Sequence, residues 1–508
     1  MKENLPVADK VDVMLLLEGT FPYVSGGVSS WVNQIVRGFP DISFGAVFIG
    51  STPHEYGKMK YELPSNLLHL QLHYLHGDAS APPVKPCEGN NGGFEAISRL
   101  HGWFKGDGDE SMPDELKHLD YYRSSGNGVD YSQFLYGERA WEFIAKNFED
   151  RCTDPSFVDY FWTVRNMHAP VWQLAELAAG LIPAGCYHTV STGYAGLLGS
   201  LLHYHTGKPL VLSEHGIYTK ERRIDIFNTE WIRDNRNALQ RDPTEVSYYR
   251  DLWIRFFETL GGICYGAASR IVSLFEGARQ RQLLDGAPPE KTRVIPNGID
   301  VERYLPARKA RPADPPMVVA LLGRVVPIKD LKTYIRSVRI MLARIPGLQA
   351  WVVGPEGEDP AYAAQCRALA ESLAIQDVVV FKGFMDPRDL FPQVGLMVLS
   401  SISEGLPLVV LEGYAAGLPV VSTDVGSCRQ LVEGLGEEDE ALGHSGAVVP
   451  INSPQRLAEE CIKLLCDREN WDRAQKAAIE RVERFYTQKQ MFDAYDIIYR
   501  EALEAWQG

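Results

Sequence analysis

The chain has 508 residues, a formal net charge of −15 and 45% hydrophobic residues. This length suits two large domains or about three average ones, and the hydrophobic content excludes a wholly disordered chain. The negative charge argues against a duplex nucleic-acid partner, because phosphate contacts need clustered Lys and Arg.

The cysteines and the start of the chain indicate its setting. No two of the eight cysteines have C-x-x-C spacing, which favours a reduced protein without a structural metal or disulfides. Met1–Lys10 lacks the basic-then-apolar pattern of a secretory signal, and no apolar run approaches the roughly 18 residues that span a bilayer. We therefore expect a cytoplasmic protein without a membrane anchor of its own, which partners could recruit to the inner membrane.

The chain opens with a strand, a glycine loop and a helix. Val11–Leu17 is an apolar run typical of a buried strand, and Gly26 and Gly27 precede a helix predicted over Val28–Arg37. Glycines at such a turn let the backbone approach a phosphate at the helix start. A plain tight turn fits the glycine pair about as well.

A long insertion follows the strand predicted over Phe44–Ile49. From about residue 51 to residue 130 the alternation of strands and helices breaks down, and we predict an insertion that is mobile in part. Asp107 and Asp109 within it have a D-x-D spacing that suits a metal ion. Since no strand precedes them, a solvated loop is the favoured interpretation.

The alternation resumes after the insertion. Helices are predicted over Tyr131–Phe148 and Phe157–Ala179, and His168 in the second is expected to be a packed residue. The strand Pro209–Ser213 leads directly into Glu214-His215-Gly216, and polar residues at the carboxyl end of a strand are candidates for a site. Tyr218–Arg250 is polar and mixed in charge, which predicts a mobile loop leading into a helix.

A Pro- and Ala-rich linker divides the chain. We predict a first domain over residues 1–305, a second over 306–485, and a C-terminal helix over 486–508 that packs back on the first domain. In the second domain the strand Met317–Leu322 ends in a turn that carries Arg324 and Lys329. An Arg and a Lys five positions apart at a strand-to-helix turn would suit a pyrophosphate.

The most informative stretch lies later in the second domain. A strand over Leu396–Leu399 is followed by a polar turn with Glu404 and by a helix predicted over Leu406–Ala416, which contains Glu412. The two carboxylates are eight residues apart, a little over two helical turns, and are expected on one side. The start of the helix suits a phosphate and a carboxylate further along suits the hydroxyls of a ribose. Both domains therefore read as α/β with doubly wound parallel sheets.

These motifs together resemble the retaining glycosyltransferases of family 4. The resemblance spans nearly the whole chain apart from the insertion and the tail, and the opening Leu15–Val32 is more similar still to the cytosolic glycosyltransferases of Pel exopolysaccharide synthesis. It implies the GT-B fold, with two Rossmann-like domains facing a cleft. The matching residues are Gly26-Gly27, Glu214-His215-Gly216, Asn297-Gly-Ile-Asp300, Gly323-Arg324 with Lys329-Asp330, and the pair Glu404 and Glu412.

The resemblance also implies a role for each site residue. Arg324 and Lys329 would hold the diphosphate of a UDP-sugar, Glu412 would bind its ribose, and His215 would face the sugar from the first domain. Gly26 and Gly27 would approach the diphosphate or the acceptor. Transfer would retain the anomeric configuration and need no metal or other cofactor, and the acceptor would be a growing polysaccharide or a lipid-linked sugar, with membrane-embedded synthase partners. The donor sugar would be positioned by Glu404, Gly405, Leu406, Pro407 and Leu408.

Two other functions fit the same residues. A UDP-sugar epimerase would use this two-domain fold without any acceptor, so product analysis separates it from a transferase. An inactive subunit that only senses a nucleotide would bind without turnover. A phosphorylase is disfavoured, because the sequence shows no signal for a pyridoxal-binding Lys.

Overall fold

The computed structural model describes residues 5–76, 91–105, 114–123, 128–237 and 245–507. The chain divides into two compact units. The first contains residues 1–273, 279–293 and 497–508, and the second contains residues 274–278 and 294–496. Each unit is built on its own parallel β-sheet.

The sheet of the first unit has the strand order β3-β2-β1-β4-β5-β6-β7, with parallel pairing throughout its registered strands. The side chains from Val13 to Leu17 in its middle strand are all buried, as expected for a strand covered on both faces. Parallel neighbours need crossover connections, so helices lie on both faces. The strands are β1 (Val11–Glu18), β2 (Phe44–Gly50), β3 (Leu67–Tyr74), β4 (Ala184–Thr189), β5 (Leu210–Glu214), β6 (Arg270–Ser273) and β7 (Thr292–Val294).

Different helices cover the two faces of this sheet. On one face, Trp31 of α1 (Gly27–Gly38) and Tyr499 of α19 (Gln488–Gln507) both contact His188 of β4. On the other face the core is filled by side chains of α5 (Phe157–Gly180), α6 (Tyr194–Thr206) and α8 (Tyr248–Ala267). Met14 and Leu16 of β1 belong to this core, and by the two-residue period of a strand the buried Val13 and Leu15 face the other side of the sheet.

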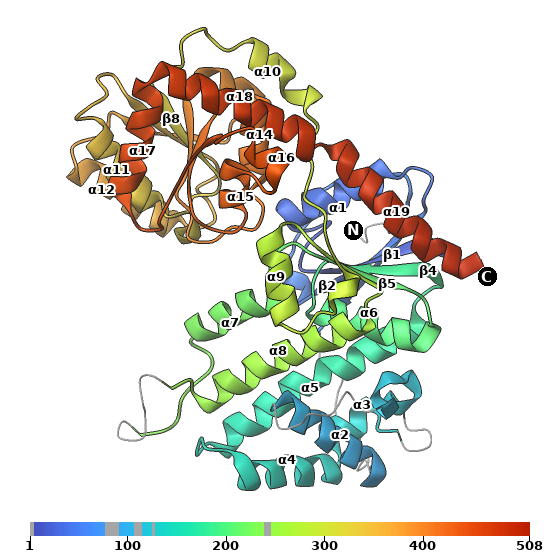
Figure 1. Ribbon diagram of the computed structural model, residues 1–508. Helices are drawn as coiled ribbons and strands as arrows, with labels where there is room; N and C mark the ends of the chain where they lie inside the picture. The colour runs from blue at the N-terminus through green and yellow to red at the C-terminus, as the bar shows by residue number, and fades with distance from the viewer. Residues whose placement is uncertain (1–4, 77–90, 106–113, 124–127, 238–244, 508) are drawn as a thin grey trace. The chain divides into compact units, whose positions relative to one another are not determined.

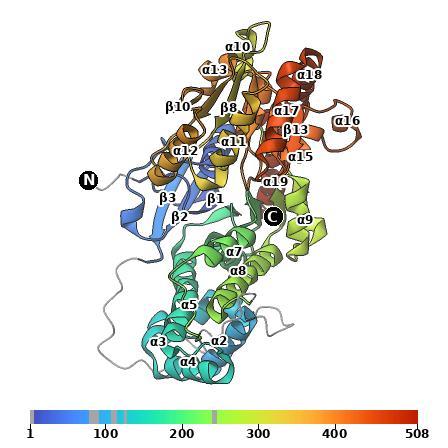
Figure 2. The ribbon, with the colours of Figure 1, turned by 90° about the vertical axis from the view of Figure 1, so that its left-hand side faces the viewer.

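Further helices pack outside α5 and α8. Figures 1 and 2 both show α2 (Asn91–Phe104), α3 (Tyr131–Tyr136) and α4 (Glu138–Arg151) gathered against them, with α7 (Tyr218–Asn228) along α8. Inside this group His101 is hydrogen-bonded to His168 (3.1 Å) and to the Tyr160 hydroxyl (3.1 Å), and all three side chains are buried. His168 is therefore a packed residue, as predicted.

The sheet of the second unit has the order β10-β9-β8-β11-β12-β13 and is also parallel. β8 lies at the point where the strand order reverses, so the helices that follow β8 and β11, α11 (Leu331–Met341) and α14 (Leu408–Ala415), cover opposite faces of the sheet. The strands are β8 (Val318–Leu322), β9 (Gln349–Val353), β10 (Val379–Gly383), β11 (Leu396–Leu399), β12 (Val420–Thr423) and β13 (Gly446–Val449).

Two cores sandwich this second sheet. Val319 and Leu321 of β8 face one core and Ala320 and Leu322 face the other, as the two-residue period of a strand requires. The first core is covered by α11 (Leu331–Met341), α12 (Pro360–Ser372) and α17 (Pro454–Cys466), and the second by α14 (Leu408–Ala415), α15 (Cys428–Glu433) and part of α18 (Arg468–Phe485). The remaining helices are α9 (Glu276–Leu284), α10 (Leu305–Lys309), α13 (Pro387–Leu390) and α16 (Glu437–Glu440).

The structure differs from the predicted elements in three places. The division between the units falls after Arg293 rather than after residue 305. The range predicted as an insertion contributes β3 to the first sheet and α2 to the outer helices. Tyr218–Asn228 is helical rather than a loop. The sequence pattern did not show this helix, because only three of its residues are buried and their spacing is too sparse to form an apolar period.

The C-terminal helix α19 reaches the first unit with its last turns. The Tyr499 hydroxyl is hydrogen-bonded to His188 Nδ1 at 2.8 Å, and its ring packs against Phe39 and Phe44. Glu501 pairs with Arg270 at 3.0 Å. In the described part of the chain, none of the helices combines the length and the apolar character needed to cross a membrane.

Candidate functional site

The loops after β8 and β11 form one hydrogen-bonded edge of the second sheet. β8 and β11 are parallel neighbours, so both loops leave the same edge. The Ile402 N–H donates to the Ile328 carbonyl at 2.8 Å, and the Ser400 hydroxyl donates to the carbonyls of Lys329 and Asp330 at 2.8 and 3.0 Å. The two loops are therefore fixed relative to one another, together with the charged residues that they carry.

Lys329 and Glu404 form an ion pair across these loops. The Lys329 ammonium lies 2.5 Å from Glu404 Oε1, and the Ser401 hydroxyl donates to the same oxygen at 2.5 Å. Only 17% and 12% of the two side chains are exposed, so the pair is little screened by solvent. The positive charge of Lys329 is thus held in place by Glu404, the residue that the family resemblance assigns to the donor sugar.

Arg324 carries the second positive charge of this edge. Its Nη1 contacts both carboxylate oxygens of Glu358, at 2.6 and 2.7 Å, and the two side chains are 54% and 51% exposed. An exposed pair of this kind contributes at most about 1 kcal/mol and exchanges readily with solvent or another anion. Arg324 can therefore turn toward a diphosphate at small cost.

Glu412 lies on α14 beside Tyr304 of the same unit. Burial raises the pKa of its carboxyl, and hydrogen bonding by Tyr304 and the nearby Arg303 partly offset that rise. Burial beside Glu412 in turn raises the pKa of the Tyr304 hydroxyl. A carboxylate of this kind gains by accepting hydroxyl donors, because they stabilise its charged form.

The start of α14 follows Glu404 directly. The helix begins at Leu408, two residues later than predicted, and no side chain among the described residues caps it at Pro407. Leu406 is 7% exposed and belongs to the second core, which anchors the turn. Glu404 therefore lies in the loop before the helix, as predicted, and Glu404 and Glu412 each have their own partner.

Gly426 explains why this turn is close-packed. It has a φ of +54°, and a Cβ there would lie 2.2 Å from the Glu404 carbonyl oxygen and 2.4 Å from that of Gly405. The Ser427 N–H donates to the Gly405 carbonyl at 2.9 Å. Only glycine permits this approach, which holds the Glu404-Gly405 backbone against α15.

Gly26 and Gly27 lie at the start of α1 in the first unit. Gly26 is extended, with a φ of 170°, a conformation open to any residue. A Cβ at either glycine would meet nothing within 4 Å. The pair is thus not required by the fold around it, and it leaves open space beside the first turn of α1.

His215 follows β5 in the first unit. Its ring meets Trp31 of α1 edge to face, with centroids 4.5 Å apart, and its Nε2 is buried without a hydrogen-bond partner among the described residues. Burial lowers the pKa of His215 to about 3, so the ring is neutral at physiological pH. A neutral imidazole can hydrogen-bond a sugar hydroxyl, but it does not act as a cation.

Glu214 precedes His215 and is 1% exposed. It accepts hydrogen bonds from the Tyr218 N–H, the Tyr265 hydroxyl and the Gln282 amide, each at 3.0 Å. Burial raises its pKa to about 7, although the three donors oppose that rise. These bonds lock the turn that presents His215.

Several residues of the two edges were not predicted from the sequence. His188 on β4 is hydrogen-bonded to Ser213 Oγ at 2.8 Å and to Tyr499, and burial lowers its pKa to about 3. Tyr304 and Glu358 complete the surroundings of Glu412 and Arg324. Glu358 lies just beyond β9, and a charged residue after a strand is the signal that could have indicated it. Nothing near Tyr304 in the sequence indicates Glu412.

A metal ion needs a cluster of at least three ligands. Among the described residues, no group of three or more His, Cys, Asp or Glu side chains could hold a metal ion. Asp107 and Asp109 lie outside the described residues. Metal independence therefore stays a prediction.

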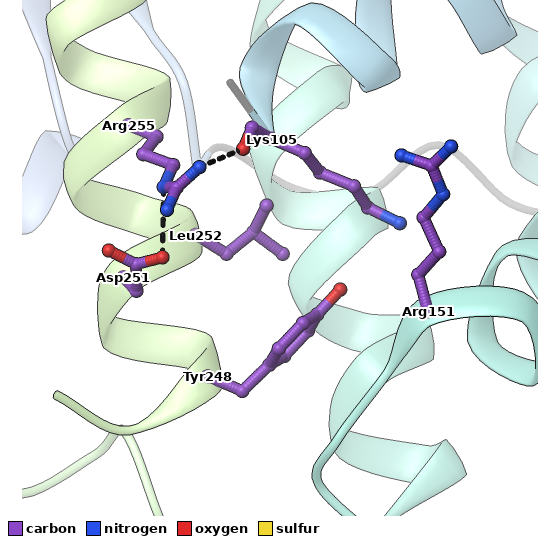
Figure 3. Close-up of a pocket in the computed structure, with 6 residues that line it drawn as sticks. All are labelled: Lys105, Arg151, Tyr248, Asp251, Leu252 and Arg255. Carbon is purple, nitrogen blue, oxygen red and sulfur yellow. Dashed lines mark hydrogen bonds and ion pairs between the residues drawn. The ribbon is translucent and has the colours of Figure 1, made fainter. Parts of the chain in front are cut away.

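A basic cavity of about 180 Å³ lies among the helices of the first unit (Figure 3). Arg255 pairs with Asp251 at 2.9 Å and donates to the Lys105 carbonyl oxygen. The Lys105 ammonium lies 5.5 Å from the centre of the Tyr160 ring. The cations here are held by neighbouring groups, and the cavity lies between helices rather than at the end of a strand.

Two family models match the chain. One, described as "Domain of unknown function (DUF3492)", matches residues 11–290, which is more than half of the chain. The other, described as "Glycosyl transferases group 1", matches residues 316–467 and includes the loops with Arg324, Lys329, Glu404 and Glu412. The two matched ranges correspond closely to the two units.

Curated relatives match about half of the chain. A D-inositol 3-phosphate glycosyltransferase of Streptomyces bingchenggensis is 28% identical over 257 residues, which are 47% of this chain and 54% of the relative. One of the same name from Actinosynnema mirum is 32% identical over 277 residues, 50% of this chain and 61% of the relative. The chain thus spans only a little over half the length of these relatives.

Solved structures share the fold of the whole chain. HepE of Anabaena in complex with UDP has a TM-score of 0.58 at 14% identity, covering 96% of this chain and 100% of that one. Sucrose-phosphate synthase of Thermosynechococcus elongatus has a TM-score of 0.56 at 17% identity, covering 97% of this chain and 100% of that one. The predicted GT-B class, two parallel-sheet α/β domains, is confirmed.

Proposed function

We propose that this chain, which belongs to the DUF3492 family and carries a group 1 glycosyltransferase domain, is a retaining glycosyltransferase that uses a UDP-sugar. The observation that carries the proposal is the ion pair between Lys329 and Glu404, fixed by the hydrogen-bonded loops after β8 and β11. A little-screened cation at the carboxyl end of parallel strands is suited to an anionic ligand. The glycosyltransferases among its relatives and the UDP complex of HepE support this function.

The leaving group of the reaction is a nucleoside diphosphate. As the glycosidic bond to the diphosphate breaks, negative charge develops on its oxygen atoms, and a cation already in position lowers the energy of that charge. Lys329 would supply a point charge and Arg324 a forked contact, so the two would divide the diphosphate between them. Arg324 is free to move for this purpose, since its pair with Glu358 is exposed.

The nucleoside and the sugar would lie on either side of the diphosphate. Glu412 would accept the ribose hydroxyls, which would stabilise its buried charge. The uncapped start of α14, with Gly405, Leu406, Pro407 and Leu408, would face the donor together with Glu404. His215, held neutral by burial, would accept or donate a hydrogen bond to the sugar rather than stabilise charge.

The acceptor belongs to the finer part of the proposal. We take it to be a growing exopolysaccharide or a lipid-linked sugar, supplied in the cytoplasm by membrane-embedded synthase partners. The opening Leu15–Val32 resembles PelF, the glycosyltransferase of Pel exopolysaccharide synthesis, and this resemblance is the reason for the choice. The reaction would proceed without a divalent metal, with Arg324 and Lys329 in its place.

The first experiment is a calorimetric titration of the full chain with UDP, GDP and ADP, each with and without EDTA. Selective binding of UDP that survives EDTA is expected. Absence of nucleotide binding would contradict the site, and binding that requires a divalent ion would contradict metal independence and return attention to Asp107 and Asp109.

The second experiment tests turnover. The full chain is incubated with UDP-glucose, UDP-galactose and UDP-N-acetylglucosamine, with and without oligosaccharides or D-inositol 3-phosphate as acceptors. Acceptor-dependent release of UDP with retention at the transferred carbon is expected. Conversion of one UDP-sugar to its epimer without acceptor would favour an epimerase, and binding without turnover in the presence of synthase partners would favour a sensing subunit.

A further inference from the structure

A cavity of about 350 Å³ lies in the first unit, between α6, α7 and α8. Its volume suits a small ligand of one or two rings, at the lower end of the range for ligand pockets. Part of it comes from α7 and the residues that follow, the stretch predicted as a polar loop. The lining residues used below are Tyr194, Arg222, Asp225, Trp231, Trp253 and Phe257.

Aromatic rings form one continuous wall of this cavity. Trp253 stacks on Phe257 with centroids 5.9 Å apart and an interplanar angle of 24°, and it meets Trp231 edge to face at 5.8 Å. Trp253 is 7% exposed and fixed in the core, whereas Trp231 is 64% exposed at the rim. A wall with a rigid base and an accessible aromatic rim can bind the apolar C–H face of a pyranose ring.

Two charged residues of α7, Arg222 and Asp225, also line this cavity. Arg222 contacts Asp225 at 3.4 Å and Glu18 at 3.7 Å, and its guanidinium lies over the Phe257 ring at 5.8 Å. A guanidinium and a carboxylate side by side offer N–H donors and oxygen acceptors in fixed places. Vicinal hydroxyls of a sugar ring match such a pair.

This cavity is joined to the carboxyl edge of the first sheet. Glu18 is the last residue of β1, and it accepts a hydrogen bond from the Tyr218 hydroxyl at 2.8 Å. The Tyr218 N–H donates to Glu214, which immediately precedes His215. A sugar in the cavity would thus lie next to the turn that presents His215.

We propose that this cavity binds a pyranose ring of the carbohydrate acceptor. The proposal rests on the glycosyltransferase function above, and it names neutral carbohydrate as the acceptor class at this subsite. Trp231, Trp253 and Phe257 bind the face of the ring, and Arg222 and Asp225 bind its hydroxyls.

The test measures the binding of cellotetraose, maltotetraose and chitotetraose to the full chain by tryptophan fluorescence and by calorimetry. At least one of them binds, and Trp231→Ala weakens it about tenfold, as loss of an aromatic contact does. Trp253→Phe reduces the aromatic surface at the base of the wall, and it weakens binding roughly three- to tenfold. The matched control is Trp141→Ala on α4, since Trp141 is 54% exposed and lines none of these walls.

Three outcomes would overturn the proposal: none of the oligosaccharides binds, binding is equal in Trp231→Ala and in wild type, or an apolar dye binds here and no oligosaccharide does. Trp231 is exposed, so its variant tests the cavity even if Trp253→Phe fails to fold. A UDP titration of the same preparation separates the two proposals. Binding of UDP without oligosaccharide defeats the cavity assignment alone, and binding of oligosaccharide without UDP defeats the donor assignment alone.

Discussion

The carboxyl edges of the two parallel sheets differ in the charge of the side chains that they carry. In the second unit the loops after β8 and β11 present an ion pair between Lys329 and Glu404 and an exposed pair between Arg324 and Glu358. In the first unit the corresponding edge presents His188 and His215, whose pKa values burial lowers to about 3. We call the edge of the second unit the charged edge and that of the first unit the neutral edge, because its two imidazoles are uncharged at physiological pH.

Burial and partners account for the difference. Lys329 is paired with a carboxylate 2.5 Å away, whereas the imidazoles of the neutral edge are packed against Trp31, and His188 is hydrogen-bonded to the neutral side chains of Ser213 and Tyr499. A buried group without an opposite charge takes its neutral form. Parallel topology therefore fixes where a site forms, and the local partners decide whether it stabilises charge or positions a neutral ligand.

The largest effect is expected from Lys329→Ala. The change removes the cation that would face the leaving diphosphate, and loss of one such electrostatic group lowers turnover by about 10²–10³-fold. The measurement is the rate of acceptor-dependent UDP release per folded enzyme. Lys329→Arg keeps the charge and should retain more activity than the alanine variant.

The double variant Lys329→Ala with Glu404→Ala separates charge stabilisation from structure. Lys329→Ala alone leaves the Glu404 carboxylate, 12% exposed, with the Ser401 hydroxyl but without its cation, and this lowers stability. The double variant relieves that cost and should remain inactive. Recovery of turnover in the double variant would show that Lys329 acts only through folding.

The next effect concerns stability and comes from Glu214 in the neutral edge. Burial raises its pKa from 4.5 to about 7, so between these values the folded state holds a proton that the unfolded chain has lost. The free energy of unfolding therefore falls as pH rises through this window, by about 3 kcal/mol, and is constant above it. Glu214→Gln should remove this fall, which urea unfolding between pH 4.5 and 8 measures.

The control for Glu214→Gln is the difference between its stability curve and that of wild type. His188 and His215 have lowered pKa values, and their contribution rises with pH between about 3 and 6.5, opposite in sign to that of Glu214. It is present in both proteins and cancels in the difference. The Gln282 carbonyl, which has no partner among the described residues, can turn to accept the new amide. Parallel curves would contradict the assigned pKa.

The charged edge was more predictable from the sequence than the neutral one. Arg324, Lys329 and Glu404 lie just beyond apolar runs with strand character, and charged residues at such positions stand out. Glu412 lies in the predicted helix that follows Glu404. In the second unit the strands predicted over Met317–Leu322 and Leu396–Leu399 agree with β8 and β11 to within one residue, while β13 was not predicted.

The first unit was less predictable because its contacts join distant segments. His188 meets Tyr499 across 311 positions, and Glu18 meets Tyr218 across 200, and neither pairing leaves a local pattern. The helix α7 shows no clear apolar period, because it covers α8 with few buried side chains. Sequence spacing detects neighbours within one turn or one strand, whereas these sites depend on packing between elements.

A smaller effect is expected from Glu412→Gln in the charged edge. The variant loses a charge-assisted bond to the ribose worth about 1.5–3 kcal/mol, so UDP affinity should fall by roughly 10–100-fold. Discrimination between UDP and 2′-deoxy-UDP should fall with it. Since burial raises the pKa of Glu412, wild-type affinity should also decline toward acidic pH, and that decline should vanish in the variant. Unchanged discrimination would contradict the assigned role.

The smallest effect is expected from Glu358→Gln. In the free protein Arg324 Nη1 is held by both oxygens of Glu358, and this contact must weaken before Arg324 can face a diphosphate. An exposed pair is worth no more than about 1 kcal/mol, so removing its charge should raise UDP affinity by at most about fivefold and leave the unfolding free energy nearly unchanged. Calorimetry measures UDP affinity in Arg324→Ala and in the double variant Arg324→Ala with Glu358→Gln. The two affinities should be equal, because the gain in affinity requires Arg324. A gain that persists without Arg324 would mean that Glu358 repels the diphosphate directly, and the charged edge would then be set by its carboxylates as much as by its cations.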